Sequence, residues 1–328
     1  MRDPKIFYFC YDHDRATGGQ KHTYQHVDIL NKHGYEAFIF HRKKDFRLDW
    51  FENQTKVIDV ERVKEIYNSD HDYIVLPEDL GTRISNYPGK KIVFNKNLYC
   101  GFQVFGDQRP SYDPYQDKNV LAALTVSEHN TSHLKFAYPH LDVIRVYAGI
   151  DDRVFRYNEL KHKERRISCI AKSAARGSLL TLYHTLQARA EAGLNKLKDY
   201  EWTFVEGQSE KQVAEVLFKS LIFVFTSFEE GLGRMPLEAM LSGCLVAGLN
   251  SGPPKEYLLP RCRFEVGNII EMARFIEEIT ELFPGKIDHW QQLSENGREN
   301  ALTYSLEHQE RSVIEAWERI VSRKAAAA

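Results

Sequence analysis

The 328-residue sequence predicts an α/β protein built from two Rossmann-like, doubly wound parallel-sheet domains. Strand-like and helix-like segments alternate along the chain, which is typical of parallel sheets covered by helices. The strand-like runs are short and almost wholly apolar, as expected of strands buried on both faces. The length allows about two domains, each with its own core.

The first half follows this pattern from its start. Residues 6–10 form an apolar strand-like run, and a loop ending in two glycines leads to a helix predicted over roughly residues 20–33. Gly34 is expected to end this helix, because glycine tolerates the left-handed backbone that follows a helix. The later strands of this half are predicted at 37–40, 73–76, 91–94, 124–126 and 143–146.

The second half repeats the alternation after a charged stretch at about residues 151–166, which we interpret as the linker. Apolar residues at helical spacing over 306–322 predict a terminal helix. The strands of this half are predicted at 167–171, 202–205, 221–225 and 244–247.

Composition narrows the class of protein. A hydrophobic share of 43% with 27% charged residues is ordinary for a soluble globular protein. The net charge of −2 gives no basic field for nucleic acid. Basic clusters at 41–44 and 161–166 leave two alternatives open, namely solvated loops and a weak peripheral contact with an anionic membrane. Without a signal peptide or an apolar run of ~20 residues, we expect a cytoplasmic protein.

Cysteines and histidines give no metal-binding pattern. The five cysteines are scattered and no Cys-x-x-Cys pair occurs, so a zinc ribbon or dithiol redox site is not expected. Among thirteen histidines, the pairs His22/His26 and His129/His133 each share one helix face. Neither pair has an H-E-x-x-H pattern or an evident third ligand nearby. We expect no functional metal and no other cofactor.

The most informative segment is 226–248, where a glycine-rich loop links a buried strand to a helix. Glu230 and Glu238 are separated by seven residues across this loop. Gly231 and Gly233 allow the backbone to approach a ligand closely, and Pro236 suits a first helical turn. A loop of this kind lies at the carboxyl edge of a parallel sheet, where open α/β sheets bind ligands.

The residue types indicate what this loop binds. The start of the helix favours a phosphate, which would repel a carboxylate. The two glutamates are therefore expected to accept hydrogen bonds from neutral hydroxyls, such as those of a sugar and a ribose joined by a diphosphate. The alternative is an acidic loop followed by a helix whose first-turn glutamate only offsets the helix dipole.

The segment resembles the Glu-x7-Glu signature of the family-4 retaining glycosyltransferases, which have the GT-B fold. The resemblance implies that Glu230 contacts the donor sugar and Glu238 the nucleotide ribose. The loop backbone would bind the rest of the donor through Gly231, Leu232, Gly233 and Arg234.

Further segments extend the resemblance over most of the chain. Gly18 and Gly19 stand where the family has a Gly-Gly loop beneath the donor phosphates, although a Gly-Gly before a helix is usually only a tight turn. Residues 91–99 resemble a cleft-facing strand end, so Asn95 and Asn97 would bind hydroxyls or, equally, cap a following turn. The segments 126–128 and 146–151 resemble two motifs near the crossover, and Gly149 would line the cleft.

Two departures from the family pattern stand out. The family usually has an Arg and a Lys five apart after the first strand of the second domain, whereas this chain has Lys172 and Arg176, four apart and reversed. Both still supply positive charge for a leaving diphosphate. The active-site His that the family commonly has in the first domain has no clean match here.

The resemblance implies a retaining glycosyltransferase that moves a sugar from a nucleotide diphosphate sugar to a carbohydrate or lipid-linked acceptor, in bacterial polysaccharide or glycoconjugate synthesis. It implies catalytic roles for Glu230, Lys172 and Arg176. The alternatives are a non-catalytic nucleotide-sugar-binding subunit and a sugar-nucleotide epimerase or phosphorylase on the same fold. The predicted domains are an acceptor-side domain at 1–155, a donor domain at 156–305 and a terminal helix at 306–324 that packs back on the first.

Overall fold

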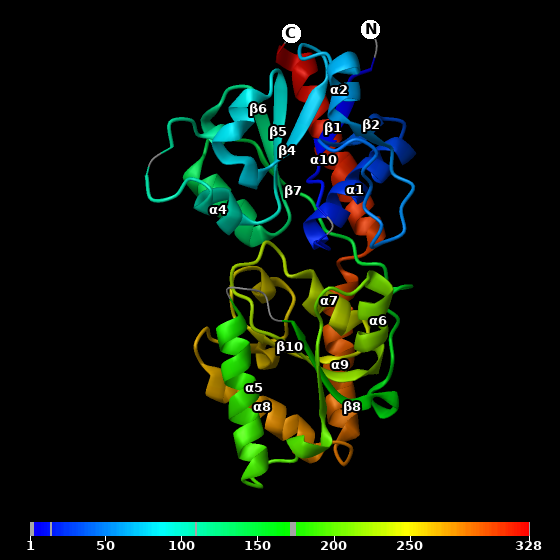
Figure 1. The fold of residues 1–328 in the computed structure, drawn as a ribbon, viewed down its shortest axis with the longest axis vertical. Helices are drawn as coiled ribbons and strands as arrows, with labels where there is room; N and C mark the ends of the chain where they lie inside the picture. Colours follow the sequence, from blue (N-terminus) through cyan, green and yellow to red (C-terminus); the bar gives the residue numbers. More distant parts are fainter. Residues whose placement is uncertain (1–2, 14, 109, 171–174, 328) are drawn as a thin grey trace. The chain divides into compact units, whose positions relative to one another are not determined.

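The computed structural model describes residues 3–13, 15–108, 110–170 and 175–327. It divides into two compact units, the first formed by Met1–Gly149 with Leu306–Ala328 and the second by Ile150–Ser305. Figure 1 shows the elements of each unit.

In its described residues the first unit has a seven-stranded sheet in the order β3-β2-β1-β4-β5-β6-β7, with every pair of neighbours parallel. The strand order reverses between β1 and β4, and in open α/β sheets such a switch point is where ligands bind. The strands are β1 (Lys5–Phe9), β2 (Glu36–His41), β3 (Val57–Asp59), β4 (Tyr73–Pro77), β5 (Lys90–Asn95), β6 (Val120–Thr125) and β7 (Val143–Arg145).

Helices cover this sheet, and the side chains between them form the first core. Leu76, Val93 and Leu134 are among its fully buried members. The helices are α1 (Gly18–Lys32), α2 (Val60–Ile66), α3 (Leu98–Gln103), α4 (Glu128–Ala137) and α10 (Leu306–Ala327), with 3₁₀ segments η1 (Glu78–Asn86) and η2 (Pro114–Gln116).

The second unit has a five-stranded parallel sheet over its described residues, in the order β12-β11-β10-β8-β9. Its switch point lies between β8 and β10. The strands are β8 (Glu164–Ile170), β9 (Glu201–Phe204), β10 (Ser220–Phe225), β11 (Leu245–Leu249) and β12 (Arg263–Phe264).

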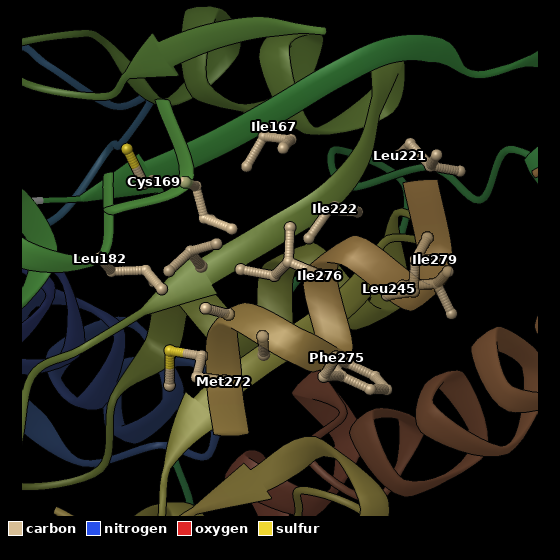
Figure 2. Close-up of a cluster of buried hydrophobic side chains, with 14 of the residues drawn as sticks. Ile167, Cys169, Leu182, Leu221, Ile222, Leu245, Met272, Phe275, Ile276 and Ile279 are labelled. Atoms are coloured by element: carbon tan, nitrogen blue, oxygen red, sulfur yellow. The ribbon is translucent and has the colours of Figure 1, made fainter. Parts of the chain in front are cut away.

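A separate core fills the second unit. Figure 2 shows side chains from β8, β10 and β11 meeting those of α5 and α8, among them Ile222, Leu182 and Ile276. The helices are α5 (Arg176–Glu191), α6 (Glu210–Lys219), α7 (Arg234–Leu241), α8 (Ile269–Leu282) and α9 (Ile287–Leu302), with 3₁₀ segments η3 (Leu160–His162), η5 (Leu197–Asp199), η6 (Pro253–Glu256) and η7 (Pro260–Cys262).

The predicted fold class is confirmed, because both sheets are parallel and covered by helices. Strands β3 and β12 were not predicted; they have three and two residues and lie at sheet edges, too short to give a periodic signal. β6 begins at Val120, earlier than residue 124, because its alanines have low strand propensity. β8 begins at Glu164, inside the stretch interpreted as a linker.

Helix α10 belongs to the first unit, and in Figure 1 it lies beside α1. The fully buried Trp317 explains how it is fixed there. The Trp317 indole donates a hydrogen bond to the Tyr8 hydroxyl at 2.9 Å, and its ring meets that of Tyr73 edge-on at 5.6 Å. An aromatic ring that is buried and also hydrogen-bonded specifies one orientation of the helix.

No helix within the described residues is long and apolar enough to cross a membrane. All five cysteines are free, and only Cys100 is exposed.

Candidate active site

The loop between β10 and α7 is shaped by its backbone. β10 is buried throughout and ends at Phe225. The chain then turns so that Gly233 takes φ +79°, a conformation that favours glycine, and α7 begins at the next residue. This places the glycine loop at the carboxyl edge of the sheet, beside the switch point between β8 and β10.

Tyr257 fixes the loop between β10 and α7 through hydrogen bonds. Its buried hydroxyl donates to the carbonyl oxygens of Leu232 and Gly233 at 3.0 and 2.9 Å. Burial raises the pKa of this hydroxyl well above its ordinary value, and the charge of Glu230 raises it further. Tyr257 therefore stays protonated and keeps donating to these two carbonyl oxygens.

Glu230 and Glu238 are both buried in this region, although neither lies in an apolar core cluster. Glu238 lies in α7, where its Oε1 is 3.5 Å from Nε of Arg234. Nη1 of Arg234 is buried and has no hydrogen-bond partner among the residues that the structure describes. A buried guanidinium donor without a protein partner is costly, and an oxygen-rich ligand would satisfy it.

Of the predicted basic pair Lys172 and Arg176, the structure describes only Arg176. Lys172 lies outside the described residues. Arg176 is the first residue of α5, is half exposed, and pairs with Glu206 at 3.2 Å. The preceding carbonyl of Ala175 accepts a hydrogen bond from Thr226 Oγ1 at 3.2 Å, which ties the start of α5 to the start of the glutamate loop. The two predicted donor elements of this unit are thus neighbours.

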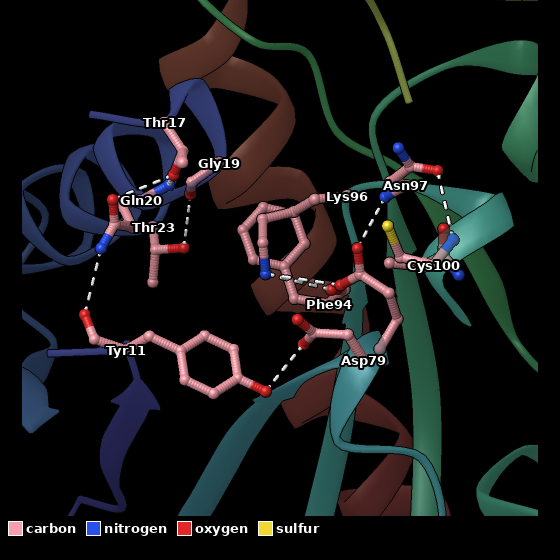
Figure 3. Close-up of polar contacts among 12 residues, drawn as sticks. Tyr11, Thr17, Gly19, Gln20, Thr23, Asp79, Phe94, Lys96, Asn97 and Cys100 are labelled. Carbon is pink, nitrogen blue, oxygen red and sulfur yellow. Dashed lines mark hydrogen bonds and ion pairs between the residues drawn. The ribbon is translucent and has the colours of Figure 1, made fainter. Parts of the chain in front are cut away.

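In the first unit, Gly18 and Gly19 open helix α1. Thr17 caps the helix by accepting from the amide of Gln20 at 3.3 Å. Figure 3 shows the Lys96 side chain close to this turn, and a Cβ added at Gly19 would lie 3.3 Å from Cδ and Cε of Lys96. Gly19 therefore provides room for a lysine in addition to presenting amides.

Further polar residues follow the carboxyl ends of β4 and β5 in the first sheet. Glu78 is buried, with Oε2 at 3.4 Å from Nζ of Lys96 and Oε1 accepting from the amide of Asn97 at 2.7 Å. Beside it, the Tyr11 hydroxyl donates to Asp79 Oδ1 at 3.0 Å (Figure 3). Burial raises the pKa of Glu78, and the charge of Lys96 opposes the rise.

The amides predicted to face a cleft have partners within the first unit. Asn95 is fully buried, donates to the Tyr115 hydroxyl at 2.8 Å and accepts from Asn130 at 3.1 Å. Asn97 caps α3, as its side-chain oxygen accepts from the amide of Tyr99 at 2.9 Å. These contacts match the capping alternative for Asn97 and give Asn95 a role in the interior.

Gly149 lies against the start of α10. An added Cβ would be 2.5 Å from Oε1 of Gln309 and 3.0 Å from Cα of Leu306. The close approach of these two segments is sufficient reason for glycine at this position.

The histidine pairs are engaged with their neighbours. Nε2 of His22 and Nε2 of His26 lie 3.1 Å apart in the interior, and the rings of His129 and His133 pack at 4.8 Å. Within the described ranges, no group of three or more His, Cys, Asp or Glu side chains is arranged to hold a metal ion.

Sequence reasoning missed Tyr257, Glu78 and Lys96. Tyr257 is more than twenty residues beyond the loop that it supports, so no local signal connects them. Lys96 lay inside the run singled out for its amides, and a charged residue directly after a buried strand was an available signal. Glu78 follows β4 in the same way.

Comparison with known proteins agrees with this geometry. Residues 187–300 match the model of the family described as glycosyl transferases, group 1. An α-1,6-glucosyltransferase of Actinobacillus pleuropneumoniae serotype 7 (strain AP76) is 26% identical over 256 residues, which span 74% of this chain and 72% of that protein.

Solved structures share the architecture. Sucrose-phosphate synthase from Thermosynechococcus elongatus has a TM-score of 0.69 at 13% identity, over 99% of this chain and 100% of that one. The Anabaena protein Alr3699/HepE, solved with UDP and glucose, has a TM-score of 0.66 at 10% identity, over 96% and 100%. At such identities these structures establish the fold alone.

The two parallel-sheet units and these structural likenesses define the GT-B fold, as the sequence predicts. The family match covers the whole of the glutamate loop. The chain is an enzyme that uses a nucleotide sugar as donor.

Proposed function

We propose that the protein is a retaining glycosyltransferase that transfers a hexose from a nucleotide diphosphate sugar to a carbohydrate or lipid-linked acceptor in bacterial polysaccharide or glycoconjugate synthesis. The observation that carries this proposal is that Glu230 and Glu238 are buried on either side of a glycine loop, beside Nη1 of Arg234, a buried donor without a hydrogen-bond partner in the described parts of the chain.

Each glutamate has a role that its chemistry supports. An ionised carboxylate accepts hydrogen bonds only, so it suits hydroxyl groups. Glu238, in the first turns of α7, would accept from the ribose hydroxyls, and Glu230 from hydroxyls of the donor sugar. Arg234 would donate through Nη1 to an oxygen of the donor, which removes the cost of a buried unpaired group.

The chemical task is to stabilise a nucleoside diphosphate as it leaves while positive charge develops on the sugar. Fixed cations and amide dipoles do this with little reorganisation. Arg176, Lys172, the amides of the Gly231–Arg234 loop and Gly19 are the proposed groups. We assign no protein base, because the leaving phosphate is able to take the acceptor proton.

We further propose that no metal ion takes part. Support comes from the lack, within the described parts of the chain, of a cluster of metal-ligating side chains, while charged side chains and amides serve the diphosphate. Turnover should therefore continue in excess EDTA. If chelation abolished turnover and Mg²⁺ or Mn²⁺ restored it, charge stabilisation by protein groups alone would be rejected.

UDP-glucose is the first donor to test. The relative from Actinobacillus pleuropneumoniae is named as a glucosyltransferase, and HepE was solved with UDP and glucose. A screen of UDP, GDP, ADP and dTDP and their sugars by thermal shift would identify the donor, since a ligand that binds the folded state raises apparent stability.

The decisive variant is Glu238→Ala. Losing hydrogen bonds to a charged acceptor should cost roughly 1.5–3 kcal/mol of donor affinity, measured by calorimetry. Glu229→Ala is the matched control, because it removes the same charge from the same loop at a residue outside the proposed site. Unchanged affinity in well-folded Glu238→Ala would eliminate the ribose role.

A further inference from the structure

The carboxyl edge of the first sheet holds a buried ion pair that the family resemblance did not assign. Glu78 directly follows β4 and Lys96 directly follows β5, and these strands are neighbours. Glu78 is only 4% exposed, and its Oε2 has no hydrogen-bond partner among the described residues. A buried carboxylate is costly unless it is compensated, and Lys96 is the compensating charge.

The ammonium group of Lys96 is itself incompletely satisfied. It carries three donors, yet its contacts in the described chain are long, with Glu78 Oε2 at 3.4 Å and the Phe94 carbonyl at 3.5 Å. It also lies 4.9 Å from the centre of the Phe94 ring. Good N–H···O hydrogen bonds are about 2.9 Å long. With 19% of its side chain exposed, Lys96 is able to donate to an acceptor from solvent.

A second source of positive potential adjoins this ammonium. Gly19 lies in the first turn of α1, a helix of 15 residues, and a Cβ added there would lie 3.3 Å from Cδ and Cε of Lys96. The first amides of a helix have no partner within the helix, and they carry partial positive charge. The nearby carboxylate of Asp79 accepts a hydrogen bond from Tyr11. A helix start and a lysine side by side are suited to phosphate oxygens.

We propose that Lys96 donates a hydrogen bond to a diphosphate oxygen of the nucleotide donor, and that Glu78 is the positioning residue that holds its ammonium beside the Gly18–Gly19 turn. This inference rests on the proposed function.

The test is calorimetry with UDP and, by competition, uridine, in the absence of acceptor. Lys96→Met should lower UDP affinity roughly tenfold or more, the effect of losing a charge-assisted hydrogen bond, and leave uridine affinity unchanged. Lys96→Arg should restore most of the UDP affinity. As a single substitution, Glu78→Gln should weaken UDP binding. In the Lys96→Met background it should cause no further loss of affinity, because Glu78 acts through Lys96.

Lys91→Met is the matched control. Lys91 lies on the same strand β5, is buried, and pairs with Asp117 at 3.2 Å, but it lies near the amino end of the strand. Its replacement removes the same charge from the opposite edge of the sheet and should leave UDP affinity unchanged. An equal loss of affinity in Lys91→Met would overturn the proposal.

A labelling measurement on the wild type covers the case in which Lys96→Met does not fold. UDP should slow the reaction of Lys96 with an amine reagent, detected by mass spectrometry, whereas uridine should not. Equal labelling with and without UDP would contradict the contact.

The remaining outcomes separate this inference from the proposed function. If the wild type binds UDP through Glu238 and Lys96→Met binds it equally well, the Lys96 contact is wrong and the proposed function stands. If Lys96→Met only raises KM for a phosphate-bearing acceptor, the phosphate belongs to the acceptor and the donor contact is rejected. If the wild type binds no nucleotide, both fail.

Discussion

The two units arrange polar groups at a sheet edge in different ways. In the second unit, the loop before α7 is fixed through its backbone, with Gly233 at φ +79° and two consecutive carbonyls held by Tyr257. In the first unit, the polar groups are held in place by contacts between side chains, chiefly the ion pair of Glu78 with Lys96. A site built on glycines in fixed order leaves a trace in the sequence, whereas one built from distant side chains leaves much less.

The interiors differ as well. The buried histidines His22, His26 and His41 all lie in the first unit, while the histidines of the second unit are exposed. His26 lies 3.3 Å from the hydroxyl of Tyr8, which in turn accepts from Trp317. These contacts link α1, which carries the Gly18–Gly19 turn, to α10. The contacts between α1 and α10 therefore include a titratable side chain, His26.

The largest difference between the units should appear in acid. Burial lowers the pKa of His26 from about 6.5 to about 3. Between these values the unfolded chain binds a proton that the folded chain does not, so stability falls as the pH falls through this window. Each pH unit costs up to about 1.4 kcal/mol, and at pH 4 the first unit should have lost on the order of 3 kcal/mol.

The measurement is hydrogen exchange in α1 and in β10, corrected for the intrinsic rate, from pH 7 to pH 4. Protection should decline faster in α1. In His26→Gln the slope for α1 should be shallower by about one proton, whereas the exposed His184→Gln should behave as wild type. The same slope in His26→Gln and wild type would show that another group controls acid stability.

The next effect concerns catalysis in the second unit. If Arg176 faces the leaving diphosphate, Arg176→Ala should lower kcat roughly 10²-fold, more than it raises KM, because charge on the diphosphate grows toward the transition state. Glu206→Ala is the control, since it breaks the ion pair but keeps the cation. Lys172→Ala tests the other predicted cation. Near-wild-type turnover in both Arg176→Ala and Lys172→Ala would place the diphosphate elsewhere.

Gly233→Ala tests whether the backbone defines the second site. The substitution forces alanine into a left-handed conformation and places its Cβ 2.8 Å from Oη of Tyr257. We expect a loss of roughly 2 kcal/mol in stability and weaker donor binding. Gly207→Ala has the same sign of φ, at +65°, with no atom within 4 Å of the added Cβ. It isolates the backbone strain, and equal effects on donor binding would show that the contact with Tyr257 is irrelevant.

The sequence was sufficient for the fold and for the glutamate loop. Buried parallel strands are continuous apolar runs, and the glycines, proline and glutamates of 226–248 lie in one local segment. Strands β3 and β12 escaped prediction because edge strands of two or three residues carry no periodicity.

The sequence was not sufficient for Lys96 and Tyr257, for a different reason. Lys96 acquires its partner only when β4 and β5 pair, which places Glu78 beside it. Tyr257 reaches the loop only after the chain has passed through β11. Contacts between residues far apart in sequence depend on the folded sheet, so local patterns do not encode them.

The smallest expected effect isolates the hydrogen bonds that fix the loop. Tyr257→Phe removes the donor to the carbonyls of Leu232 and Gly233 but keeps the ring. The unfolding free energy should fall by about 1 kcal/mol, and donor affinity should fall with it because the loop loses its fixed shape. Tyr200→Phe is the control: its buried hydroxyl has no partner in the described chain, so its removal should be neutral or stabilising. Urea unfolding and calorimetry of both variants decide the matter. If Tyr257→Phe binds UDP as tightly as Tyr200→Phe does, the loop keeps its shape without these hydrogen bonds, and the contrast between the two edges is smaller than the geometry indicates.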